Sequence, residues 1–71
     1  MLLKSSGGGR FLLDVSEPEL LLLNNALNEV CNGVHLDEVE FSTRLGVSRD
    51  EARRLLRLVN AALKGIGPAP A

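Results

Sequence analysis

The chain has 71 residues, a formal net charge of −1 and a hydrophobic share of 45%, which suits one small domain with a modest core. One cysteine excludes an internal disulfide, and one cysteine with one histidine is too small a ligand set for a closed zinc site. The balanced charge argues against a strongly basic chain and against an acidic disordered one.

The first fifteen residues predict a β-hairpin. Two apolar segments, 2–5 and 10–15, flank the triple glycine at 7–9. A lone two-stranded hairpin is marginal in water, so we expect it to pack on the helices or to pair with another chain. The glycines lack the Gly-Lys-Ser/Thr ending and the strand-to-helix context of a phosphate-binding loop, which favours a plain turn.

The apolar segments are too short for a targeting signal or a membrane span. Residues 1–3 are apolar and Lys4 follows them, which falls short of the core of a signal peptide. The longest apolar run, Leu20 to Leu23, has four residues, whereas a span needs about 20. With a single unpaired thiol, this predicts a cytoplasmic protein without membrane contact.

Three capped helices are predicted after the hairpin. Their spans are 17–32, 38–45 and 49–64. Each follows an N-cap residue with a glutamate three residues later, and these caps are Ser16, Asp37 and Ser48. Each ends near a glycine suited to the left-handed conformation, namely Gly33, Gly46 and Gly65.

These elements define the expected fold class. It is mainly α: a small three-helix domain with a helix-turn-helix-like second and third helix, preceded by a short N-terminal β-hairpin at about 2–15. We expect one domain over residues 1–66 and a flexible tail at 67–71.

The first predicted helix has one apolar face and one mixed face. The apolar face, taken as its core side, holds Leu20, Leu23, Ala26, Leu27, Val30 and Cys31. Leu21 and Leu22 point elsewhere, beside Asn25. They either cover the hairpin or, with Leu12 of the hairpin, form a contact surface for a second subunit or a partner.

Catalysis finds little support in the sequence. Cys31 lies on the apolar face and is interpreted as an inert core thiol, and His35 as a loop or packing residue. Neither has a third group to orient it, as a nucleophile–base pair requires. Glu38 and Glu40 are explained as favourable charges at a helix N-terminus. We expect no enzyme, no cofactor and no metal.

The third predicted helix carries a basic stripe beside an apolar face. The apolar positions are Ala52, Leu55, Leu56, Val59 and Leu63. Within an arc of about 80° beside them fall Arg49, Arg53, Arg57, Asn60 and Lys64. A solvated charged face is the ordinary explanation of such a stripe.

The segment of about 38–57 resembles the helix-turn-helix of many bacterial DNA-binding proteins. Ser42 provides the small residue where two helices cross closely, and Gly46 the turn residue with positive φ. The apolar helix-contact positions are Phe41, Leu45, Val47, Ala52 and Leu55. The resemblance covers about 20 of the 71 residues and names a superfamily. Capped amphipathic helices joined by a tight turn would produce much of the same pattern in a protein that binds no nucleic acid.

The resemblance implies contact with duplex DNA through the third helix. The positions that face bases and phosphates in the family fall on Ser48, Arg49, Asp50, Arg53, Arg54 and Arg57, and Lys64 extends the stripe. Arginines suit phosphates and guanine edges, whereas Asp50 would repel phosphate but could accept from a cytosine amino group. A module of this size would act as a homodimer on two half-sites.

The charge distribution supports an alternative. Residues 1–10 carry +2, residues 11–43 carry −7 and residues 44–71 carry +4. The acidic segment could dock on a basic protein, as in an inhibitor, immunity or adaptor protein, with charge steering the encounter. Two binding functions therefore stay open, one toward duplex DNA and one toward a basic protein.

Overall fold

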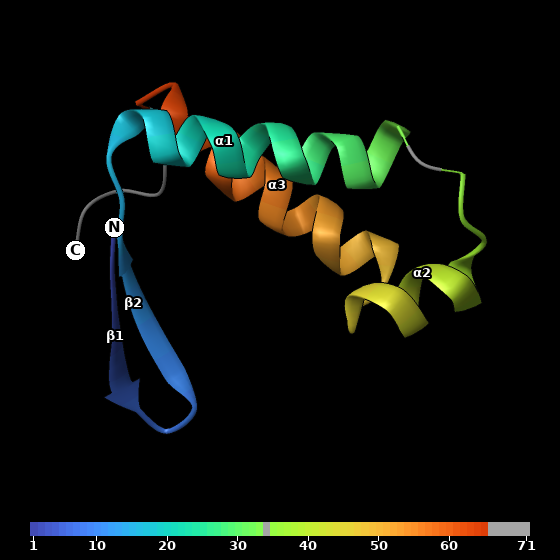
Figure 1. Cartoon of the computed structure of the whole chain (residues 1–71), viewed down its shortest axis with the longest axis horizontal. Helices are drawn as coiled ribbons and strands as arrows, with labels where there is room; N and C mark the ends of the chain where they lie inside the picture. Colours follow the sequence, from blue (N-terminus) through green and yellow to red (C-terminus); the bar gives the residue numbers. More distant parts are fainter. Residues whose placement is uncertain (34, 66–71) are drawn as a thin grey trace.

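A computed structural model describes residues 1–33 and 35–65, which form an antiparallel hairpin followed by three helices (Figure 1). The strands are β1 (Leu2–Gly7) and β2 (Arg10–Asp14). The helices are α1 (Glu17–Asn28), its π-helical continuation η1 (Glu29–Gly33), α2 (Glu38–Leu45) and α3 (Arg49–Leu63). The predicted fold class is confirmed. The predicted tail at 67–71 lies outside the described residues.

The hairpin closes through a glycine turn and stands away from the helices (Figure 1). Gly8 and Gly9 have φ angles of 64° and 75°, the combination of a type I′ turn, whose twist matches that of the strands. Both strands are exposed along their whole length, and among the described elements they contact only each other. Packing of the hairpin on the helices of its own chain, one of the two expected outcomes, is therefore not observed.

The strand register gives the hairpin one apolar face. Leu3 pairs with Leu13, and Ser5 pairs with Phe11. Since paired residues and residues two apart point to the same side, these four side chains share one face. We call the three large ones, Leu3, Phe11 and Leu13, the hairpin face; each is exposed.

All three predicted N-caps are confirmed. Ser16 Oγ accepts from Glu19 N (3.3 Å), while Glu19 Oε1 accepts from Ser16 N (2.9 Å), which completes a reciprocal capping box. Asp37 Oδ1 accepts from Glu40 N (2.7 Å), and Ser48 Oγ accepts from the backbone N of the third residue of α3 (3.2 Å). Each bond satisfies a backbone donor that the first helical turn would otherwise leave unpaired.

The helix ends match the prediction at two glycines of three. Gly46 and Gly65 have φ angles of 80° and 73°. The expectation of a left-handed Gly33 is wrong, because the first helix does not stop there in a C-cap but widens after Asn28 into the π-helical turn η1. Cys31 lies within that turn and is buried in the core.

The core is small and lies at the end of the molecule farther from the hairpin (Figure 1). Its buried members are Cys31 from η1, Phe41 from α2 and Ala52 from α3. Half-buried residues that pack against them are Val30, Leu36 and Leu56. Along the rest of α1 and α3 the predicted core positions are only half-buried, and Ala26 and Leu55 are exposed. The helices therefore close around one end and leave the remaining apolar surface open.

Candidate nucleic-acid interface

The connection between α2 and α3 contains the left-handed glycine that the resemblance predicts. Gly46 ends α2 in the left-handed conformation, and its N–H donates to Ser42 O at 2.9 Å. A side chain there would meet no atom within 4 Å, so the glycine is required by its φ angle and not by space. Of the five apolar contact positions of the resemblance, Phe41 and Ala52 are buried. The other three, Leu45, Val47 and Leu55, remain 41–50% exposed.

Arg49 faces the interior of the chain, although the resemblance assigns it to DNA. Its Nε lies 3.0 Å from Glu38 Oε1, and its Nη1 donates to Cys31 O at 3.1 Å. Its Nη2 donates to Leu36 O, and its Cζ lies 4.7 Å from the centre of the Phe41 ring. Only 13% of the side chain is exposed. The guanidinium thus ties η1, the following connection and α2 to the start of α3.

This role was missed although the spacing contained the signal. Arg49 precedes Ala52 by three residues and Leu56 by seven, which puts all three on one face of α3. A planar guanidinium can stack on an aromatic ring while its five donors reach carbonyl groups that a helix end leaves unpaired. An arginine at a core-facing position beside a phenylalanine is therefore a candidate for an internal tie.

The remaining cations of α3 are exposed. We call Arg53, Arg54, Arg57 and Lys64 the basic face. Among the described residues none of these four forms an ion pair. Ser48 is half-buried and occupied as the N-cap of α3, whereas Asp50 is exposed at the start of the helix. Of the six positions that the resemblance assigns to DNA, Arg53, Arg54 and Arg57 thus keep free cationic groups at the surface.

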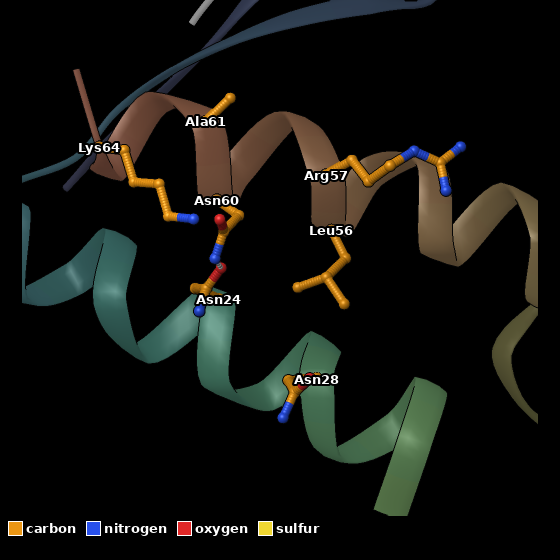
Figure 2. Close-up of a pocket in the computed structure, with 7 residues that line it drawn as sticks. All are labelled: Asn24, Asn28, Leu56, Arg57, Asn60, Ala61 and Lys64. Atoms are coloured by element: carbon orange, nitrogen blue, oxygen red, sulfur yellow. Dashed lines mark hydrogen bonds between the residues drawn. The ribbon is translucent and has the colours of Figure 1, made fainter. Parts of the chain in front are cut away.

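A first groove lies beside the basic face, between α1 and α3 (Figure 2). Its volume is about 350 Å³, and it is lined by Asn24, Asn28, Leu56, Arg57, Asn60, Ala61 and Lys64. Asn60 Nδ2 donates to Asn24 Oδ1 at 3.3 Å across it. Figure 2 shows the Arg57 guanidinium directed away from this amide pair, while the Lys64 side chain extends toward it. Asn60, predicted on the basic stripe, is therefore partly engaged with α1.

A second groove, on the other side of the contact between α1 and α3, is apolar. We call it the apolar groove; its volume is about 520 Å³. The residues that line it are Leu23, Ala26, Leu27, Val30, Leu45, Val47, Glu51, Ala52 and Leu55. Most of the apolar positions that a closed three-helix core would bury thus line this open groove.

The residues predicted as a partner interface all lie at the surface. Leu21 and Leu22 on α1 are 50% and 69% exposed, and Leu12 on β2 is 63% exposed. Asn25 is exposed on the same side of α1. The hairpin does not cover Leu21 and Leu22. Of the two alternatives predicted for them, a contact surface for a second subunit or a partner therefore stays open.

Cys31 and His35, the two side chains considered for catalysis, differ in their exposure to solvent. Cys31 is buried and His35 is exposed in the connection before α2. No group of three potential metal ligands gathers among residues 1–33 and 35–65.

The carboxyl group of Glu19 has a lowered pKa. It accepts a hydrogen bond from the Ser16 backbone N–H and lies 3.1 Å from the Met1 ammonium. The backbone bond lowers the pKa most, and the ammonium lowers it further.

Within the described part of the chain, no helix is long and apolar enough to cross a bilayer. Comparison with known protein families, with curated proteins and with solved structures gives no match. The functional argument therefore depends on the surfaces of this chain alone.

Proposed function

We propose that this chain is a non-enzymatic DNA-binding module of the helix-turn-helix type, which contacts duplex DNA with the basic face of α3. The observation that carries the proposal is that Arg53, Arg54 and Arg57 are exposed and unpaired among the described residues, on a helix joined to α2 by the left-handed Gly46. Exposed guanidinium groups bind phosphates and guanine edges by charge-assisted hydrogen bonds.

The position of Arg49 supports the same function indirectly. Because its guanidinium binds two carbonyl groups and Glu38, it fixes the start of α3 against α2. A recognition helix must keep its angle when it enters the major groove. We therefore assign Arg49 to positioning and the DNA contacts to Arg53, Arg54, Arg57 and Lys64.

The test is a salt titration with a charge-matched control. Anisotropy of a labelled duplex is measured against salt concentration for the wild type, for Arg57→Glu and for Arg44→Glu. Three to four phosphate contacts give a log–log slope of about −3, and each lost arginine contact reduces that slope by about 1. The control Arg44→Glu changes the net charge equally, but Arg44 lies on α2, where it is 3.7 Å from Glu40. Absent binding at low salt, or equal losses in both variants, would refute the proposal.

A second candidate function is docking on a basic protein through the acidic segment 11–43. The observation that favours it is the outer side of α1, where Leu21 and Leu22 are exposed between Glu17 and Glu29. These two carboxylates form no ion pair within the described residues. Apolar side chains flanked by free charges are typical of a protein-binding surface.

Reversal of those two charges distinguishes the candidates. Glu17→Lys/Glu29→Lys should abolish capture of a basic partner, whereas it should strengthen association with DNA. Glu19 is left unchanged because it caps α1 and pairs with the N-terminus, so its reversal would disturb the fold as well as the charge.

A further inference from the structure

Two apolar surfaces of this chain lack a counterpart in the described structure. The first is the hairpin face, where Phe11 is 64% exposed and Leu3 67%. The second is the apolar groove of about 520 Å³ between α1 and α3. A lone two-stranded hairpin needs a packing partner for stability in water. Each of these two surfaces is apolar and exposed, so contact between them would bury both.

The chain exposes more surface than a compact monomer of the same mass. The chain exposes 5671 Å², whereas a compact monomer of 7.6 kDa exposes about 4,300 Å². Its radius of gyration is 13.4 Å, against about 11 Å for a compact chain of this length. The excess area is larger than the roughly 800 Å² that each partner buries in a standard interface.

The hairpin extends away from the groove of its own chain. Only Val15 and Ser16 separate β2 from α1, and Ser16 forms the reciprocal capping box with Glu19. The Met1 ammonium lies 3.1 Å from Glu19 Oε2. Figure 1 shows the hairpin leaving α1 at its N-terminal end and extending away from it. In the described structure the hairpin face therefore does not reach the groove of its own chain.

Charge complementarity points to the same occupant. The hairpin segment 1–10 carries +2 from Lys4 and Arg10, and Glu51 is the charged residue among those that line the apolar groove. The hairpin of a second copy therefore brings cations to a groove whose charged residue is a carboxylate.

We propose that the hairpin of each copy packs its Leu3, Phe11 and Leu13 side chains into the apolar groove of a second copy, in a symmetric dimer with two equivalent contacts. Two-fold symmetric dimers are the commonest homo-oligomers. The groove is lined by Glu51, Ala52 and Leu55, which lie on a side of α3 distinct from Arg53 and Arg57, so these two arginines stay free. The dimer does not depend on DNA binding.

Disulfide capture between two variants, each with one added cysteine, tests the contact directly. Ser5→Cys places a thiol on the hairpin face, and Ala26→Cys places one in the groove; both positions are exposed. The native Cys31 is 1% exposed and serves as the unreactive background in the wild-type control. A 1:1 mixture of the variants under mild oxidation should give a covalent dimer, while each variant alone should give only the wild-type background.

Other results would overturn the proposal in defined ways. Crosslinking of Ser5→Cys alone would show that hairpins pair with each other, and crosslinking of Ala26→Cys alone would show that helices do. A disulfide within a single chain of the double variant, with the mass of a monomer, would show that each hairpin folds back on its own groove.

Light scattering provides an independent readout. The wild type should have twice the 7.6 kDa mass of one chain at high concentration, and Phe11→Asp or Leu27→Asp should reduce the mass to that of a monomer. Leu22→Asp is the matched control, because Leu22 is 69% exposed and lies outside both surfaces. Circular dichroism confirms that each variant keeps its helices. A wild type that stays monomeric, or equal dissociation by Leu22→Asp, would contradict the proposal.

Discussion

The two ends of this molecule are stabilised in different ways. At the end formed by η1, α2 and the start of α3, Phe41 is fully buried and Arg49 joins three elements through one guanidinium. At the hairpin end, both strands are exposed on both faces and are tied to α1 only through its first turn. The first end is held by contacts within one chain, whereas the second leaves its apolar side chains exposed.

The two phenylalanines of the chain give the largest expected difference between the ends. Phe41→Ala should lower the free energy of unfolding by about 3–5 kcal/mol, which is comparable with the whole stability of so small a domain. Phe11→Ala should change it by less than about 0.5 kcal/mol in dilute solution, because Phe11 is exposed in the single chain. Urea unfolding measures both. Equal losses in the dilute chain would show that the hairpin packs on the helices.

The second comparison is between the inward-facing Arg49 and the exposed Arg53 in their effect on the free energy of unfolding. Arg49→Ala should lower the free energy of unfolding by about 2–4 kcal/mol, because two carbonyl groups lose their donor and Phe41 loses its stacked cation. Arg53→Ala should change it by less than about 0.5 kcal/mol. Thermal unfolding monitored by circular dichroism separates them. Arg49→Lys should recover only part of the loss, since an ammonium lacks the planar fork.

The turn between α2 and α3 gives a smaller effect. Gly46→Ala should lower the free energy of unfolding by about 1–2 kcal/mol, because the φ of 80° is unfavourable for a residue with Cβ. Space is not the cause, since no atom lies within 4 Å of an added Cβ. Chemical denaturation provides the measurement. Gly46→Asn is the control, because asparagine tolerates the left-handed conformation better than alanine and should lose less.

The smallest expected effect is a pH dependence at the junction of hairpin and helix. The pKa of the Glu19 carboxyl is lowered by the Ser16 N–H and the Met1 ammonium. A carboxyl with a lower pKa in the folded state stabilises the fold above its unfolded pKa and loses that contribution as the pH falls through its folded pKa. The protection factors of amides in the first turn of α1 should therefore fall as the pH drops through the folded pKa of Glu19. Glu19→Gln should remove this dependence; an unchanged profile would contradict the assignment.

Local structure followed from short stretches of sequence. Ser16, Asp37 and Ser48 each bond to a backbone N–H three residues away, so no distant residue is needed to specify those helix starts. The glycine turn of the hairpin and the left-handed Gly46 are equally local. The π-helical turn after Asn28 was not predicted, because the predicted helix 17–32 has regular α-helical spacing throughout.

The sequence by itself therefore determined the order of elements, their caps and the concentration of cations on the last helix, because these depend on bonds and spacings within a few residues. Only the tertiary structure decided that Arg49 faces inward while Arg53, Arg54 and Arg57 do not, since that depends on Phe41 and on carbonyl groups 13 and 18 residues away along the chain. It also decided that the predicted apolar faces line an open groove. Helical periodicity identifies which residues share a face, but only packing determines which neighbour covers that face.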